Sequence, residues 1–272
     1  MDGCRAGWVA ASSEVADAGV PSLSEPSFSI ERSFRALLDG LRGRRALICV
    51  DIPIGLPTGT PLDDGRRRAD GEARTFLGHR RAVSVFSAPC RPTLSAVSHR
   101  EACDLEVQAR GCGRGLSQQS YRIIPKILDV DLVIRPEHQA PLGEGTDVWV
   151  REAHPEVTFA VLVGAGQSGH GLVHSKRGCK ACRGVVCPGE AERLALLQRY
   201  VPTFEPRAVH ERLLRDVRRQ PGQSGPVVAR DDVVDAVACL VTAQRIVTGQ
   251  ALTLPARGPQ LDARGLRMEI VA

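Results

Sequence analysis

The sequence is poor in aromatic residues, in lysine and in long apolar runs. Only 4% of its 272 residues are aromatic, so its core must consist mainly of Val, Leu, Ile and Ala. No apolar run approaches the ~18 residues of a membrane-spanning helix. No basic segment followed by an apolar one opens the chain, as a secretory leader would. We therefore expect a cytoplasmic protein with no membrane partner.

Lysine occurs only at positions 126, 176 and 180, whereas arginine is abundant. Arginine suits bidentate contact with phosphate or carboxylate, but a GC-rich coding sequence explains the same bias. The net charge of +5 is modest, so charge alone does not establish nucleic-acid binding. The nine cysteines are odd in number and scattered from Cys4 to Cys239, which favours a reducing cytoplasm over a disulfide framework.

Apolar periodicity predicts one α/β domain over residues 1–272, without an internal repeat. Short strands are expected at 8–12, 27–30 and 147–152. The continuous apolar run from Ala46 to Asp51 predicts a strand that is buried on both faces. A polar helix or a long loop is expected at 63–81, and loop-rich chain at 84–126. Further helices are predicted at 34–41, 98–110, 155–163, 190–200, 211–219 and 231–247.

Three aspartates stand at the start of the last predicted helix. At about 100° per residue, Asp231, Asp232 and Asp235 share one sector of that helix, and no Lys or Glu marks the sector as a solvated face. We expect Asp231 to cap the helix, and interaction with the helix dipole is an alternative role for Asp232. Neither role explains Asp235, because a carboxylate one turn inside an apolar helix would be partly desolvated.

Asp51 presents the same problem at the end of the buried strand. Open α/β sheets place their ligands at the carboxyl ends of strands, although a turn-forming role before Ile52-Pro53 is an alternative. Glu156, at the start of helix 155–163, has an alternative role as a partner of the helix dipole. Carboxylates from separate elements need a cation between them, and Mg²⁺ or Mn²⁺ prefers such oxygen ligands.

Eight segments follow one another in the order of the sequence blocks of one family. They are Asp2–Val9, Val50–Leu56, Arg68–Arg74, Ser84–Arg91, Gln118–Lys126, Glu152–Glu156, Ser175–Lys176 and Asp231–Ala236. In these blocks the chain resembles the DUF429 family of predicted RNase H-like nucleases. The resemblance implies an α/β fold with an RNase H-like mixed five-stranded central sheet, flanked by helices and carrying loop insertions.

The resemblance further implies a divalent-metal-dependent nuclease whose substrate and partner is nucleic acid. Asp2, Asp51, Asp232 and Asp235 would be catalytic and bind Mg²⁺ or Mn²⁺, with Glu156 as a further catalytic residue. In such nucleases two divalent ions clamp the scissile phosphate. The resemblance also implies side chains that contact the substrate, namely Arg5, Arg68, Arg74, Arg91, Lys126 and His154. For each basic residue in this set, an ordinary surface or salt-bridged role is the alternative.

The chain departs from the family pattern at two places. Several apolar residues normally precede the first aspartate, whereas Met1 alone precedes Asp2, so we expect either a misassigned start or a clipped first strand. The second departure is a Cys-rich insertion at 174–188, within the domain. The insertion contains four soft ligands, His174, Cys179, Cys182 and Cys187. Tetrahedral zinc accepts such a ligand set, and the alternative is a surface insertion with reduced thiols.

Two other functions stay open. An actin-like or sugar-kinase-like phosphotransferase or ATPase would use a strand-end aspartate with ATP-bound Mg²⁺, but no Gly-rich phosphate loop stands between a strand and a helix. A non-catalytic nucleic-acid-binding module of the same fold would be expected to have lost the acidic residues, which are all present. No aromatic platform or base-reading motif distinguishes RNA from DNA as the substrate.

Overall fold

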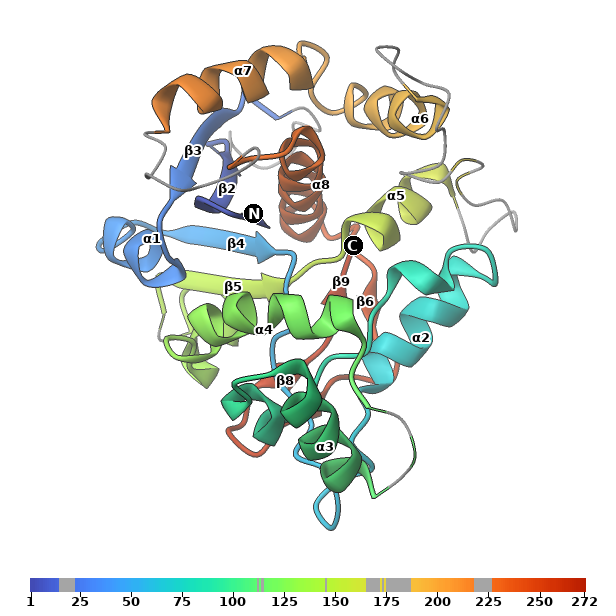
Figure 1. The fold of residues 1–272 in the computed structure, drawn as a ribbon. Helices are drawn as coiled ribbons and strands as arrows, with labels where there is room; N and C mark the ends of the chain where they lie inside the picture. Colours follow the sequence, from blue (N-terminus) through green and yellow to red (C-terminus); the bar gives the residue numbers. More distant parts are fainter. Residues whose placement is uncertain are drawn as a thin grey trace.

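The computed structural model describes residues 1–14, 23–111, 113, 115–144, 146–164, 172, 174, 187–217 and 227–272. These residues form a mixed α/β structure with eight α-helices and several small sheets (Figure 1). In this part of the chain no helix combines the length and apolar character that crossing a membrane requires.

The N-terminal sheet is antiparallel and has the strand order β1-β2-β3. It consists of β1 (Asp2–Cys4), β2 (Gly7–Ser12) and β3 (Ser27–Glu31). Asp2 lies opposite Val9 in its register. Gly7 has a φ of +138°, and a Cβ there would collide with the carbonyl of Glu31, so this position requires glycine.

The second sheet pairs β4 (Ala46–Val50) in parallel with β5 (Val148–Glu152). The expected five-stranded central sheet is wrong, because the strand ladder is interrupted between β1 and β4. At the edge of β4 that faces the N-terminal sheet lies Met1: its amine donates to the Cys49 carbonyl (2.7 Å), and its carbonyl accepts from Asp51 N–H (3.0 Å). A three-residue β1 is too short to pair with the rest of β4, so two separate sheets lie edge to edge.

Helices cover both faces of these sheets (Figure 1). On one face lies α8 (Arg230–Val247), whose Val237 packs in one apolar cluster with Val9. On the other lie α1 (Phe34–Gly40) and α4 (Gln118–Asp131), which form a cluster with Trp8 and Val50. Trp8 and Val9 point to opposite faces because side chains alternate along a strand.

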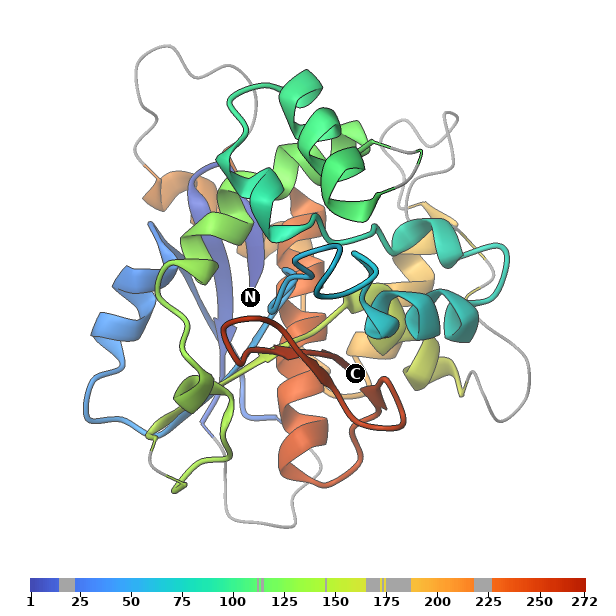
Figure 2. The ribbon, with the colours of Figure 1, turned by 90° about the horizontal axis from the view of Figure 1, so that it is seen from below.

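The remaining elements surround this layered core. Seen from below, α1 and α2 lie on opposite sides of α8 (Figure 2). The other helices are α2 (Arg68–Leu77), α3 (His99–Arg110), α5 (Pro155–Val163), α6 (Pro188–Leu197) and α7 (Pro206–Asp216), with short 3-10 helices at Ala82–Ser84, Arg91–Ser95 and Pro136–Gln139. The C-terminal strands pair as β6 (Thr253–Leu254) with β9 (Ile270–Val271) and β7 (Gln260–Leu261) with β8 (Arg267–Met268).

Two predictions about helices are corrected here. The segment 63–81 is helical only over α2, because Asp63 accepts hydrogen bonds from Thr58, Gly59 and Gly65 N–H and so holds a turn. The segment 84–126 is not all loop beyond helix 98–110, since α4 begins at Gln118. Its internal Pro125 interrupts the sequence pattern, yet the helix continues past it because Ile124 and Ile127 are buried in the core.

Candidate functional site at the end of β4

Asp2 and Asp51 lie side by side where β4 ends. The two backbone bonds of Met1 flank Val50 in the manner of a parallel pair, so the next residue of each segment, Asp2 and Asp51, is also adjacent. Met1 and Val50 point into the cluster of α1 and α4. Because side chains alternate along a strand, both aspartates point to the opposite face, where α8 lies. The structure thus brings two predicted site residues together.

Cys239 of α8 faces the same place. Its thiol lies 3.4 Å from the Met1 carbonyl oxygen and is completely buried. Burial raises the pKa of Cys239 well above its ordinary value, and the nearby Asp51 and Asp2 raise this pKa further. Both carboxylates are half-buried and lie near this neutral thiol.

The first turns of α8 carry the other predicted aspartates. The Asp232 carboxylate accepts a hydrogen bond from Ala229 N–H (2.7 Å). The helix begins at Arg230, one residue earlier than expected, so Asp232 occupies the third position, from which a side chain can reach back to the cap. The prediction that Asp231 caps α8 is therefore wrong. One turn further in, Asp235 is only 7% exposed.

Lys126 of α4 brings a positive charge close to these acids. Its ammonium donates to the Gly7 carbonyl (2.5 Å) and lies 4.8 Å from the centre of the Trp8 ring. Burial lowers the pKa of Lys126, and negative charges nearby, including Asp2 and Asp232, oppose that shift. The amine thus secures the β1–β2 turn and lies near two of the four predicted metal ligands.

Glu156, by contrast, is held in a buried ion pair. Both of its oxygens accept from the guanidinium of Arg193 in α6, at 2.7 to 2.9 Å. The side chain of Arg193 is only 1% exposed and stacks on Phe159. The adjacent His154 lies 3.3 Å from the Ser84 carbonyl through Nε2, and no described group forms a hydrogen bond with its buried Nδ1. The catalytic role of Glu156 stays a prediction.

The predicted phosphate contacts differ in their exposure and in their bonds. Arg5 and Arg68 are exposed. Arg74 donates to the Val85 carbonyl (3.0 Å) and to the Ser87 hydroxyl (2.9 Å). The remaining arginine of this group, Arg91, forms ion pairs with Asp131 (2.7 Å) and Asp262. Two of these arginines thus hold the fold, and their contact with substrate stays a prediction.

Asp2 and Asp51 suit a divalent ion that keeps part of its water shell better than an ion enclosed by protein ligands alone. In the described part of the chain, no group of three or more His, Cys, Asp or Glu side chains is arranged to hold a metal ion. Mg²⁺, however, commonly takes one or two carboxylates and completes its shell with waters and substrate phosphate oxygens. Asp2 and Asp51 fit that mode, whereas they do not form a cage made only of protein ligands.

The predicted zinc ligands are only partly described. Cys179 and Cys182 lie outside the described residues. His174 donates its backbone N–H to Glu192 (3.0 Å), and its ring Nδ1 lies 3.7 Å from the same carboxylate. Cys187 stands at the start of α6. Zinc binding by this insertion stays a prediction.

Sequence reasoning gave no role to Glu152, which ends β5 as Asp51 follows β4. The Glu152 carboxylate accepts from Ile54 N–H (2.6 Å) and from Arg67 (2.5 Å). Burial raises the pKa of Glu152 to about 8, and Arg67 acts in the opposite direction. The signal was available, because a carboxylate at the end of a buried strand is as conspicuous at Glu152 as at Asp51.

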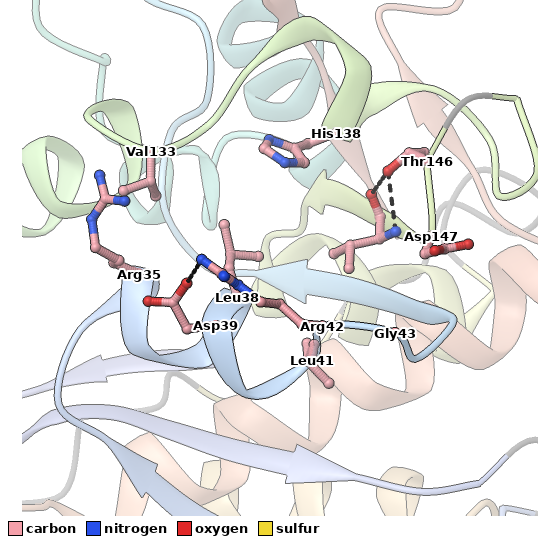
Figure 3. Close-up of a pocket in the computed structure, with 11 residues that line it drawn as sticks. Arg35, Leu38, Asp39, Leu41, Arg42, Gly43, Val133, His138, Thr146 and Asp147 are labelled. Carbon is pink, nitrogen blue, oxygen red and sulfur yellow. Dashed lines mark hydrogen bonds and ion pairs between the residues drawn. The ribbon is translucent and has the colours of Figure 1, made fainter.

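A surface pocket of about 360 Å³ lies away from these acids, between α1 and the segment before β5 (Figure 3). Arg42 is paired there with Asp39 (2.8 Å), and the Thr146 hydroxyl bonds the backbone of Val148. None of the predicted site residues lines this pocket. The candidate site is therefore the junction of β1, β4 and α8.

Comparison with family models identifies a match over most of the chain. A family model described as a protein of unknown function (DUF429) matches residues 1–259. No curated protein and no solved structure matches the chain. Because the match spans nearly all of the sequence, the chain belongs to the DUF429 family.

Proposed function

We propose that this protein is an RNase H-like nuclease that hydrolyses phosphodiester bonds in nucleic acid with the help of a divalent ion. The observation that carries the proposal is the adjacency of Asp2 and Asp51 on the face covered by α8. The strands lie in the spatial order β3, β2, β1, β4 and β5, with β1 parallel to β4 at Met1. This order is compatible with the RNase H-like core that the family resemblance implies.

Asp2 and Asp51 would hold Mg²⁺ or Mn²⁺, with Asp232 and Asp235 approaching from α8. When bound, such an ion supplies an activated water and stabilises charge on the scissile phosphate. The protein itself contributes a half-buried acidic edge, and the helix covering it excludes solvent from one side. The exposed Arg5 and Arg68 are suited to contact backbone phosphates.

Cleavage assays with Asp51→Asn and Asp235→Asn test this function. Wild-type protein should cleave RNA, DNA, hybrid duplexes or branched substrates in Mg²⁺ or Mn²⁺ and be silent in EDTA. Because outer-shell partners of a metal site already contribute about 10- to 100-fold, each substitution should lower the rate by about 100-fold or more. Asp39→Asn on α1 is the matched control: Asp39 is exposed and paired with Arg42, so this variant should retain the wild-type rate.

Metal binding gives a readout that does not depend on turnover. Titration with Mn²⁺, followed by electron paramagnetic resonance, should show a site that Asp51→Asn weakens and Asp39→Asn does not. If wild-type protein cleaves no substrate, or if both site variants cleave as fast as wild type, the nuclease proposal is wrong. ATP hydrolysis that the same substitutions abolish would favour the phosphotransferase alternative.

A further inference from the structure

An imidazole and a free thiol, those of His99 and Cys103, meet on one face of α3. The two residues are one helical turn apart, and the Cys103 sulfur lies 3.5 Å from the Nε2 atom of His99. Both side chains are partly exposed, so a dissolved ion can reach them. Neither residue belongs to the candidate site at the end of β4, so this pair calls for a separate explanation.

The carbonyl of Leu116, in the segment that leads into α4, faces both side chains. Its oxygen lies 2.8 Å from His99 Nε2 and 3.4 Å from the Cys103 sulfur. Gly115 fits directly against the thiol, since a Cβ there would lie 2.8 Å from the same sulfur. The Leu116 side chain is anchored in an apolar cluster with Ala102 of α3. A nitrogen, a sulfur and an oxygen therefore converge on one point.

The spacing of these three atoms is close to that of one face of a zinc tetrahedron. With a Zn–S bond of about 2.3 Å and a Zn–N bond of about 2.0 Å, the tetrahedral angle separates sulfur and nitrogen by about 3.5 Å, which is the distance observed. A Zn–O bond of about 2.1 Å places oxygen about 3.6 Å from sulfur, against the observed 3.4 Å. Nitrogen and oxygen would lie about 3.3 Å apart; they are closer, at 2.8 Å, because a hydrogen bond joins them.

The other ring nitrogen of His99 has a partner that can fix the tautomer a metal needs. Nδ1 lies 2.9 Å from the side-chain amide of Gln118, and the ring of Tyr121 packs edge-on against the imidazole. Because Nε2 donates to the Leu116 carbonyl, Nδ1 accepts from this amide. A half-turn of the amide presents its oxygen to an Nδ1–H instead and leaves Nε2 free of its proton. Histidines that bind metals usually have such an outer partner.

We propose that one Zn²⁺ ion binds to His99 Nε2, the Cys103 thiolate and the Leu116 carbonyl oxygen, with water as the fourth ligand. On binding, the thiol releases its proton to solvent, and the imidazole proton moves from Nε2 to Nδ1. The ion ties the start of α3 to the segment before α4, and these two helices are neighbours in the fold (Figure 1). With only two side-chain ligands, the site should bind zinc more weakly than a closed site with four.

Cobalt absorption spectroscopy tests this site. The parent protein is the whole chain with Cys179→Ser and Cys182→Ser, which removes two of the zinc ligands predicted in the Cys-rich insertion. One equivalent of Co²⁺ should bind saturably, with the strong visible bands of tetrahedral coordination and a thiolate-to-cobalt band in the near ultraviolet, and Zn²⁺ should displace it. Zn²⁺ should also raise the thermal unfolding temperature of the parent, because an ion that binds the folded state stabilises it.

Further substitutions in this parent locate the ion. Cys103→Ser should abolish the thiolate band. Because ligands and their outer partners contribute at least this much, His99→Ala and Gln118→Ala should each weaken Co²⁺ binding by about tenfold or more. Gln118 is exposed, so its variant should fold even if the other two do not. His79→Ala, at another exposed histidine, is the control and should bind Co²⁺ as the parent does.

Three results would each overturn the proposal. One is the absence of saturable Co²⁺ binding to the folded parent. Another is a thiolate band that persists in Cys103→Ser, which would place the ion elsewhere. The third is Co²⁺ binding by Gln118→Ala as tight as that of the parent and of His79→Ala. None of these results bears on the proposed nuclease, whose ion lies at the end of β4 and prefers oxygen ligands.

Discussion

Two carboxylates of the predicted site, Glu156 and Asp51, differ in their surroundings. Glu156 is matched by Arg193, whose guanidinium bonds both carboxylate oxygens and whose side chain is itself buried. Asp51 lies next to Asp2 and close to the buried Cys239 thiol. The surroundings of Glu156 are those of a structural ion pair, whereas the pairing of like charges at Asp51 is the arrangement that invites a cation.

Replacing Glu156 should therefore affect stability first. Glu156→Gln leaves the buried guanidinium of Arg193 without its counter-charge, which should lower the free energy of unfolding by about 3–5 kcal/mol. Urea denaturation measures this loss. Glu190→Gln is the control, because its pair with Arg230 is partly exposed and should contribute at most about 1 kcal/mol. A loss below that value for Glu156→Gln would contradict the structural role.

At the scale of elements, helices were more predictable from the sequence than the pairing of strands. The predicted helices 34–41, 98–110, 155–163 and 231–247 correspond to α1, α3, α5 and α8, because their apolar periodicity is local. The end of the strand before Asp51 was also predictable from local sequence. That Asp2 lies next to it was implied only by family resemblance, since pairing between Met1 and β4 depends on contacts across the whole fold. The interruption between the two sheets had one local signal, the expectation of a clipped first strand, which agrees with the three residues of β1.

Asp232, in the first turn of α8, is both a hydrogen-bond acceptor at the start of this helix and a predicted metal ligand. Asp232→Ala removes the acceptor of the Ala229 N–H and should lower the free energy of unfolding by about 1 kcal/mol. Asp232→Asn keeps an oxygen acceptor and should retain most of that stability. If Asp232 also serves the proposed metal site, the Asn variant will still lose nucleic-acid cleavage. Thermal unfolding and cleavage rates of both variants separate the two roles, and an active, stable Asn variant would leave Asp232 only its capping role.

At the scale of the molecule, buried ionisable side chains tie distant segments around the site. Arg67 precedes α2, Glu152 ends β5, and together they hold the chain at Ile54 just after β4. A second buried pair joins Arg151 to Glu269 in the C-terminal segment, at 2.6 Å. These bonds connect residues 85 to 118 positions apart in sequence. Hydropathy could not have predicted this network, because charged residues are expected at the surface.

The same network should make the stability of the whole protein depend on pH. Burial raises the pKa of Glu152 from 4.5 to about 8. Between these values the folded protein keeps a proton that the unfolded chain has released. The free energy of unfolding should therefore fall as pH rises from 5 to 8, by up to about 1.4 kcal/mol per pH unit from this group. Above pH 8 this contribution becomes constant, because both states are then deprotonated.

Urea denaturation at unit steps from pH 5 to pH 9 measures this slope. Glu152→Gln cannot ionise and should remove the contribution, so its free energy of unfolding should fall less steeply than that of wild type between pH 5 and 8. Glu137→Gln, at an exposed position, should keep the wild-type slope. Identical slopes for wild type and Glu152→Gln would mean that Glu152 is already ionised beside Arg67 at pH 5, and that the ion pair outweighs the cost of burial.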